Sequence, residues 1–474
     1  MDFKRLTPDM LPKLRSYVER QPFRLSEFSL GFQQMWLPYA RTCVAEVDGC
    51  LLIKSAYGGK THFYYPLHLD SVQAAELSAI AQLETWCVEQ GVPLVIGAIP
   101  SERLPVLVQR YGRELELSNP RMWRDYLYHL SDFVDYPGKR FAGQRNHLSK
   151  FCRCYPQAVY RPMTTEDIAV VQKFLCMYAT RQYAKHSFIA NEELHGSEQL
   201  LAAFDSLSLC GGIMEVDGRI VAITVGEVVG DTLVVHIEKA LIEYGGVYPA
   251  IAHAFAKQVA KDGVDYINRE DDAGDCGLRK SKLQYNPIQV LDKYTLIPKR
   301  IIDSLTNQPE LHTDRLDLRS VADCDVHEYG KLARDLQRSR MWGWDWSADW
   351  HGEGDPRDVW FLASSRKDFV EHRELPLGIY FGEKLVGEGV FHNFSYDNMV
   401  ELGVRLLPEA EHHGFATEAI RAMADYALCF WGLERVKAKC YLGNSPSKRM
   451  LEASGFQLIS QDDQFFYFFK TAKN

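Results

Sequence analysis

The amino-acid sequence predicts an α/β (α+β) protein made of consecutive lobes, each a mixed β-sheet flanked by helices. Three observations lead to this fold class. Residues 399–456 contain, in order, a strand, a glycine-bearing loop, a helix, a second strand and a second helix. Residues 232–287 show the same order of elements, which suggests a diverged internal repeat. A chain of 474 residues is also long enough for two or three domains, each with a sizeable core.

The best-defined element is the stretch VELGVRLLPEAEHHGFATEAIRAMADYAL at 400–428. Its first residues alternate as in a strand, and the residues from Ala416 onward have helical periodicity. Gly414 allows the intervening loop to approach a ligand closely. A loop that presents several backbone N–H groups at a helix N-terminus is suited to bind a pyrophosphate. Downstream, Asn444 and Ser447 lie where a strand gives way to a helix, so both can point into one cleft.

A polar, irregular stretch divides the chain into two parts. It follows the hydrophobic strand at 294–297, and we place a linker at 301–312. The region before the linker, 1–300, is predicted to hold two lobes of about 1–135 and 136–300. The region after it, 313–474, is predicted to be one further domain.

Composition limits the classes of protein to which the chain can belong. No apolar run approaches the ~20 residues of a membrane-spanning helix, and the N-terminus MDFKRLTPDM lacks an apolar signal core. Eleven cysteines without a CxxC pair favour reduced thiols, so we expect a cytoplasmic protein without membrane insertion and without a metal site. The chain has a net charge of −9, and residues 310–474 hold 20 basic and 27 acidic residues. This acidic balance disfavours broad binding of nucleic acid and favours a cationic amine acceptor.

The C-terminal motifs resemble those of the GNAT N-acetyltransferases, in particular the branch related to ribosomal-protein-alanine N-acetyltransferases. The loop of that family reads Gln/Arg-x-x-Gly-x-Gly/Ala, and this chain has Glu411-His412-His413-Gly414-Phe415-Ala416. The pattern Asn444-x-x-Ser447, the Gly455-Phe456 pair and the opening segment TDRLDLRSVADCD at 313–325 agree with it. Glu411 departs from the family pattern, because it brings negative charge close to the phosphates.

The resemblance implies acetyl-CoA as cosubstrate, with its pantetheine arm held between splayed strands near 400–406 and 436–442. The implied coenzyme-binding residues are Val404, Leu406, Glu411, His412, His413, Gly414, Phe415, Ala416, Thr417 and Asn444. Acetyl transfer to an amine requires a base for the ammonium and an acid for the departing thiolate. Glu401 is the candidate base and Ser447 the candidate acid. The alternative for Glu401 is an exposed carboxylate at the end of a strand.

Five of the nine tryptophans fall within the segment 338–360. In relatives this region lies over the acceptor site. The alternating Trp342, Trp344 and Trp346, together with Asp345, can therefore form an aromatic cage for a cationic acceptor. The alternative is a cluster in the core or at a domain interface.

The region 1–300 resembles a second family, the C-terminal domain of phosphatidylglycerol lysyltransferases, which uses two acyltransferase-like lobes, and the resemblance is weakest in the first 120 residues. The resemblance rests on the segments at 125–151, HIEKA at 236–240, INREDD at 267–272 and GLRKSKLQYNP at 277–287. Membrane members of that family transfer an aminoacyl group from tRNA to lipid. The loop at 243–248 has Tyr248 where glycine or alanine is expected, so this region is predicted to accommodate a coenzyme A pyrophosphate poorly.

Several charged residues of this region form a candidate second site. On strand alternation, His236 and Glu238 share one face and can act as a proton acceptor. Lys139 and Arg145 can hold a phosphate-bearing donor such as tRNA, and Arg269 and Arg279 can line a cleft at the end of a strand. The alternative for each is a solvated or polar edge without a ligand.

The sequence thus predicts an N-acyltransferase that moves an acetyl group from acetyl-CoA to an amine by direct attack. The acceptor would be a protein N-terminus, a peptide or a small-molecule amine. Two alternatives remain open: an aminoacyl-tRNA-dependent transferase acting through the N-terminal region, or a binding module with a GNAT fold and no catalytic activity.

Overall fold

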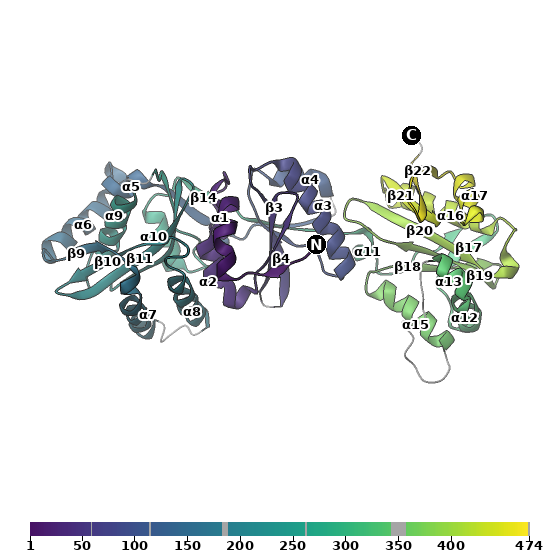
Figure 1. Ribbon diagram of the computed structural model, residues 1–474, viewed down its shortest axis with the longest axis horizontal. Coiled ribbons are helices and arrows are strands. Elements are labelled where there is room, and N and C mark those ends of the chain that lie inside the picture. The colour runs from purple at the N-terminus through teal and green to yellow at the C-terminus, as the bar shows by residue number, and fades with distance from the viewer. Residues whose placement is uncertain (58, 113–114, 183–187, 261–262, 343–356, 473–474) are drawn as a thin grey trace. The chain divides into compact units, whose positions relative to one another are not determined.

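The structure is a computed structural model that describes residues 1–57, 59–112, 115–182, 188–260, 263–342 and 357–472 (Figure 1). The chain forms two compact units. The first contains Met1–Cys87, Val92–Val108 and Glu116–Ile297, and the second contains Pro298–Asn474 with the short segments Val88–Gly91 and Gln109–Leu115.

The first lobe of the first unit is built on a sheet with strand order β1-β2-β3-β4-β6-β15-β7, in which β5 also pairs with β3. Its strands are β1 Lys4–Arg5, β2 Cys43–Val47, β3 Cys50–Tyr57, β4 Lys60–Tyr64, β5 Leu67–His68, β6 Ile96–Ile99, β7 Leu115–Ser118 and β15 Tyr294–Pro298. Its helices are α1 Leu11–Glu19, α2 Leu30–Ala40, α3 Gln73–Gln90 and α4 Leu104–Tyr111.

The second lobe is built on a sheet with strand order β14-β8-β13-β12-β11-β10-β9. Its strands are β8 Asp125–His129, β9 Val159–Pro162, β10 Cys210–Val216, β11 Arg219–Val229, β12 Thr232–Ala240, β13 Tyr266–Asn268 and β14 Gln289–Leu291. Its helices are α5 Leu130–Asp135, α6 Ala142–Cys154, α7 Ile168–Gln182, α8 Phe188–Ala202, α9 Val247–Val259 and α10 Cys276–Gln284.

The change from one sheet to the other differs from the predicted lobe boundary near residue 135. Strand β8, at Asp125–His129, already pairs with β13 and β14 of the second sheet. Strand β15, at the end of the region, returns to pair with β6 of the first sheet. The second sheet therefore begins at β8, before the predicted boundary, and β15 returns the chain to the first sheet.

The second unit has one sheet with strand order β16-β17-β18-β19-β20-β21-β23-β22. Its strands are β16 Leu311–His312, β17 Leu316–Arg319, β18 Leu375–Phe381, β19 Lys384–His392, β20 Met399–Leu406, β21 Arg435–Tyr441, β22 Gln457–Gln461 and β23 Phe465–Thr471. Its helices are α11 Ile301–Ser304, α12 Val326–Arg334, α13 Leu336–Trp342, α15 Arg357–Val370, α16 Phe415–Asp425, a π-helical turn at Tyr426–Phe430, and α17 Ser445–Ala453.

The segment predicted as a linker, 301–312, belongs to the second unit. It forms α11 and β16, and β16 pairs with β17. The side chain of Ile302 is fully buried in the core of this unit. The polar residues that suggested a linker alternate with apolar residues that anchor the segment.

Each of the three sheets contains a parallel strand pair joined by a helix. The pairs are β4 with β6 through α3, β12 with β13 through α9, and β20 with β21 through α16. The repeated order of elements that the sequence indicates is therefore present at 232–284 and 399–453. Mixed sheets flanked by helices confirm the predicted fold class.

The two faces of the second unit's sheet differ in character. Alternate residues such as Leu375, Phe391 and Leu402 form the apolar core with α16. The opposite face carries polar side chains, including Glu388 and Arg405, and faces α12 and α15. Figure 1 shows α12 and α15 on one side of this sheet and α16 and α17 on the other. Among the described helices, none is both long enough and apolar enough to cross a bilayer.

Candidate active site

A cleft of about 1500 Å³ lies in the second unit, on the polar side of its sheet and around the point where the sheet splits. Strands β20 and β21 pair in parallel only from Met399 to Glu401 and from Arg435 to Lys437. Both strands continue, to Leu406 and Tyr441, without further pairing between them within the described residues. The facing strand edges thus leave backbone groups available to a ligand, as expected for the predicted pantetheine position.

The loop before α16 has the backbone geometry of an anion-binding cradle and lies at the edge of this cleft. His412 and Gly414 both adopt left-handed backbone conformations, with φ of 63° and 78°. Gly414 is the N-cap of α16, and no side chain of the described chain caps that end. The N–H groups of Phe415, Ala416 and Thr417 therefore lack intrahelical partners, and the helix dipole adds positive potential there.

Two sets of contacts fix this cradle. The Arg315 guanidinium pairs with Glu418 at 2.6 Å and donates to the His413 carbonyl oxygen at 3.0 Å. On the other side, Arg338 of α13 donates to Glu411 at 2.7 Å. Arg338 thus offsets the negative charge of Glu411, the one departure from the family loop that argued against phosphate binding.

The floor of the cleft is a buried charged pair. Arg405 of β20 contacts Glu388 of β19 at 2.6 Å, and the Tyr329 hydroxyl donates to the same carboxylate at 2.6 Å. Trp342 covers this floor: a Cβ on Gly403 would lie 2.8 Å from its ring, and the Arg405 guanidinium lies 5.0 Å from the ring centroid.

Glu401 lies at the end of the paired segment of β20 and is held by three neighbours. Asn393 donates to one of its oxygens at 3.0 Å. Lys439 lies 3.4 Å from the other, and His392 Nε2 lies 3.9 Å from it. The Glu401 carboxylate therefore contacts three polar side chains. The alternative prediction, an exposed carboxylate at the end of a strand, does not describe it.

Asn444 and Ser447 lie at the N-terminus of α17, on the other wall. The Asn444 side chain accepts a hydrogen bond from the Ser447 backbone N–H at 3.1 Å and so caps the helix. Both residues line the cleft.

The structure brings most predicted coenzyme and catalytic residues together in this cleft. Those lining it are Trp342, Glu401, Val404, Leu406, Glu411, His412, Gly414, Phe415, Ala416, Thr417, Asn444 and Ser447. His413 is exposed outside the lining, with its ring stacked on Phe415 at 5.5 Å. Trp344, Asp345 and Trp346 lie outside the described residues.

The cleft also contains residues that sequence reasoning missed. His392 and Glu374 line it, and Arg338 contacts Glu411 of the loop before α16. Alternation along β19 places Glu388, Val390 and His392 on one face, a signal that the sequence does carry. The pairing partners of these residues, by contrast, depend on contacts between distant segments.

The predicted second site in the first unit has a different character. The His236 side chain is fully buried, with Nδ1 2.8 Å from Glu270 and Nε2 3.7 Å from Glu227. Burial opposes a charge on the ring, but the two carboxylates outweigh it and raise the pKa of His236 to about 9. A ring that already holds its proton at neutral pH is a poor proton acceptor, so the predicted role of His236 is not supported.

The other members of that site are also engaged in internal pairs. Glu238 accepts from Arg269 at 2.5 Å. The buried Arg269 guanidinium lies 4.7 Å from the centroid of the Tyr285 ring. Arg145 donates to the Gly138 carbonyl oxygen at 2.6 Å and to that of Tyr136, closing the turn before α6, whereas Lys139 is exposed.

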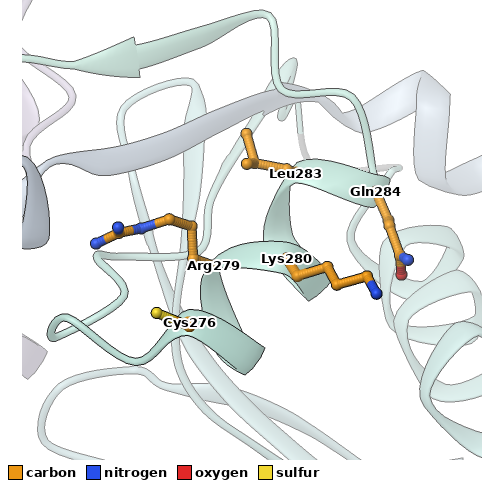
Figure 2. A pocket seen from close by; sticks show the side chains of 5 residues that line it. All are labelled: Cys276, Arg279, Lys280, Leu283 and Gln284. Atoms are coloured by element: carbon orange, nitrogen blue, oxygen red, sulfur yellow. The ribbon is translucent and has the colours of Figure 1, made fainter.

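A shallow depression on α10 contains the last predicted member, Arg279, beside Cys276, Lys280, Leu283 and Gln284. Figure 2 shows the Arg279 and Lys280 side chains extending in opposite directions from the helix. Arg279 donates to both oxygens of Asp272, at 2.9 and 2.8 Å. The charged groups therefore do not converge on a ligand position.

The loop before α9 differs in geometry from the loop before α16, although both follow the same pattern of elements. Gly246 is a left-handed N-cap like Gly414, with φ of 94°. A Cβ on Gly246 would overlap the His147 carbonyl oxygen, because α6 packs directly against the loop. The Val247 N–H is also taken, since it donates to the Tyr244 carbonyl oxygen at 3.0 Å. The loop is thus closed by backbone, in addition to the bulk of Tyr248.

The raised pKa of His236 predicts a dependence of stability on pH. A group whose pKa rises from 6.5 to about 9 on folding stabilises the fold fully below pH 6.5 and loses that contribution as the pH rises through 9. The contribution is about 3 kcal/mol at most. Lys282, with its pKa lowered to about 8 by burial, acts in the opposite direction above pH 8.

We therefore expect the difference in unfolding free energy between wild type and His236→Gln, measured by urea titration, to shrink from pH 6 to pH 10. A constant difference would contradict the charged state of His236.

Comparison with known proteins identifies both parts of the chain. Residues 19–297 match the family described as phosphatidylglycerol lysyltransferase, C-terminal, and residues 315–457 match the acetyltransferase (GNAT) domain family. The uncharacterized N-acetyltransferase YoaA of Bacillus subtilis (strain 168) is 27% identical over 162 residues, which are 34% of this chain and 89% of that protein. The uncharacterized N-acetyltransferase YnaD of the same strain is 30% identical over 97 residues, which are 20% of this chain and 56% of that protein.

Among solved structures, the crystal structure of a conserved protein of unknown function from Bacteroides thetaiotaomicron VPI-5482 is similar. It has a TM-score of 0.60 at 27% identity and covers 63% of this chain and 100% of that chain. The first family match spans more than half of the sequence. The chain therefore belongs to the phosphatidylglycerol lysyltransferase C-terminal family, and it continues into a GNAT acyltransferase domain.

Proposed function

We propose that the second unit transfers an acetyl group from acetyl-CoA to an amine by direct attack. The observation that carries this proposal is the uncapped N-terminus of α16 beside the split between β20 and β21, in one cleft. Unpaired N–H groups at a helix N-terminus suit a pyrophosphate, and the open strand edges suit an extended, amide-bearing arm.

The residues of the cleft divide the chemistry between them. The N–H groups of Phe415, Ala416 and Thr417 bind the pyrophosphate, while β20 near Val404 holds the arm and polarises the thioester carbonyl. The amine nitrogen forms a bond to the carbonyl carbon and loses a proton to a base beside Glu401. The carbon–sulfur bond then breaks, and Ser447, which also lines the cleft, protonates the departing thiolate.

The first test is calorimetric titration of the full chain with acetyl-CoA. We expect one binding site per chain, because the α9 loop of the repeat is closed by α6. Acetyl-pantetheine, which lacks the pyrophosphate, serves as the matched ligand and should bind at least tenfold more weakly. Turnover is then measured as release of free thiol with a panel of primary amines. Absence of acetyl-CoA binding by the folded protein would refute the assignment, and binding without turnover on any amine would favour a binding module.

A second candidate function concerns the first unit, which belongs to the lysyltransferase family. Lys139, Lys150 and Arg153 are exposed on α6 and the turn before it, so they can contact nucleic-acid phosphates. We propose aminoacyl transfer from tRNA as the activity of this unit. tRNA binding that weakens steeply between about 50 and 200 mM salt and falls in a Lys139→Ala/Lys150→Ala variant would support it. Equal tRNA binding by wild type and variant would refute this proposal.

A further inference from the structure

Three residues on neighbouring strands form a polar row across the floor of the cleft. In the strand register, Leu375 pairs with Phe391 and Phe391 with Leu402. The adjacent row therefore contains Glu374, just before β18, then His392 and Glu401, which are direct partners. Residues opposite one another in an antiparallel pair point to the same face, and all three line the cleft.

The next two rows cannot take up a proton from a substrate. One consists of Pro376, Val390 and Gly403, which are apolar or small. The other contains Glu388, whose carboxylate is held by Arg405 and Tyr329 and is 2% exposed. The row of Glu374, His392 and Glu401 is thus the polar part of the described floor that is open to an acceptor.

Within this row, His392 is the group suited to receive a proton at neutral pH. Its side chain is 23% exposed, and Nδ1 carries no hydrogen bond within the described part of the chain. Burial lowers the pKa of His392, opposed by the neighbouring charge of Glu401 and reinforced by that of Lys439. The ring is therefore neutral at pH 7, whereas the Glu401 carboxylate is occupied by Asn393 and Lys439.

We propose that His392 is the proton acceptor of the acetyl-transfer reaction and that Glu401 is its positioning residue. This inference rests on the proposed function. A proton passes from the ammonium group of the acceptor to Nδ1 of His392, and the freed lone pair attacks the thioester carbon. The imidazolium that forms is stabilised by Glu401, which faces Nε2, and later releases the proton to solvent. The nitrogen of the adduct loses its second excess proton as the carbon–sulfur bond breaks, and this proton balances the one that the departing thiolate takes up.

The side chains of the same row also indicate the class of acceptor. Glu374 and Glu401 flank His392, and the Glu374 carboxylate makes no hydrogen bond or ion pair with any described side chain. Burial, together with the nearby Asp368 and Glu388, raises the pKa of Glu374 to about 7. A cationic group would relieve that cost. The two carboxylates beside His392 therefore favour an acceptor whose amine is protonated at neutral pH.

The test compares two acceptors in the full-length protein. The first probe is a lysine-containing peptide, whose side-chain amine is protonated at pH 7, and the second is hydroxylamine, which is already neutral. We expect His392→Gln to lower kcat/KM for the peptide by about 10²–10⁴-fold and for hydroxylamine by less than tenfold.

The wild-type pH profile of kcat/KM should rise through the pKa of His392, and that rise should disappear in His392→Gln. Glu401→Gln should move it to lower pH. A matched change outside the cleft, His327→Gln, should leave both rates unchanged.

A second measurement separates this inference from the proposed function. Ring signals of labelled histidine, assigned with the His392→Gln variant, give the titration of His392 without turnover. A ring that is protonated at pH 7 overturns the proposal, as do equal losses with the two amines. If either outcome is found and acetyl-CoA binding is intact, only the proposed role of His392 is refuted. Loss of acetyl-CoA binding in the wild type removes the proposed function as well.

Discussion

Replacing Arg405 by alanine is expected to lower the free energy of unfolding of the second unit by about 3–5 kcal/mol. Arg405 is 8% exposed and Glu388 2% exposed, so the pair is almost completely removed from water. Loss of the guanidinium leaves a buried carboxylate whose one remaining partner among the described residues is the Tyr329 hydroxyl, at 2.6 Å. The cost of that uncompensated charge exceeds the cost of the cavity alone. Differential scanning calorimetry of the full chain measures the change in the transition of this unit.

A matched double variant distinguishes the charge from the cavity. Arg405→Met combined with Glu388→Gln removes both charges, keeps similar volumes and leaves the amide able to accept from Tyr329. We expect this variant to recover more than half of the stability lost in Arg405→Ala. If the single variant loses less than about 1 kcal/mol, the pair behaves as a hydrated surface ion pair, and the floor of the cleft is wetter than the structure indicates.

The locked pair matters for function because it restricts where chemistry can occur. Glu388 and Arg405 face the cleft, but their charges compensate each other and are covered by Trp342. Such a pair gives the floor a fixed shape and offers no proton to a substrate. The reactive part of the cleft is then the neighbouring row at the split of the sheet, where β20 separates from β21 after Glu401.

Local signals explain which parts of the fold and site the sequence could predict. The left-handed conformation at Gly414, the start of α16 and the strand before it follow from residues adjacent in the chain. The repeat at 232–284 follows from the same local pattern, including the left-handed Gly246. These features need no knowledge of what packs against them.

The remaining features depend on contacts between distant segments. His236 has the residue type of a base, but Glu227 and Glu270 hold it as a cation, and neither pairing can be derived from spacing. The closure of the Gly246 loop depends on α6, which lies far upstream in the sequence. His392 was missed for a related reason, since only the register with β20 places it opposite Glu401. The lobe boundary differs from the predicted one for the same reason, since the pairing of β8 with β13 and β14 places Asp125–His129 in the second sheet.

The second large effect concerns coenzyme binding, through Ala416 at the second position of α16. We expect Ala416→Glu to weaken acetyl-CoA binding by about 30- to 100-fold, which is about 2–3 kcal/mol. The new carboxylate would lie among the N–H groups that are proposed to hold the pyrophosphate, where it both repels the phosphates and competes for their donors. Titration calorimetry of wild type and variant measures the loss.

Ala416→Glu should not lower the free energy of unfolding. Weaker acetyl-CoA binding without a loss of stability would therefore point to the binding site itself. A carboxylate in the first turn of a helix interacts favourably with the helix dipole, by about 0.3–1 kcal/mol. Ala416 is only partly buried, so the larger side chain can reach solvent. Ala416→Gln has nearly the same volume without the charge and should retain most of the acetyl-CoA affinity. Equal losses in the two variants would indicate steric obstruction. Unchanged binding in Ala416→Glu would mean that the pyrophosphate does not bind at α16, and the acetyl-transfer proposal would then lose the observation on which it rests.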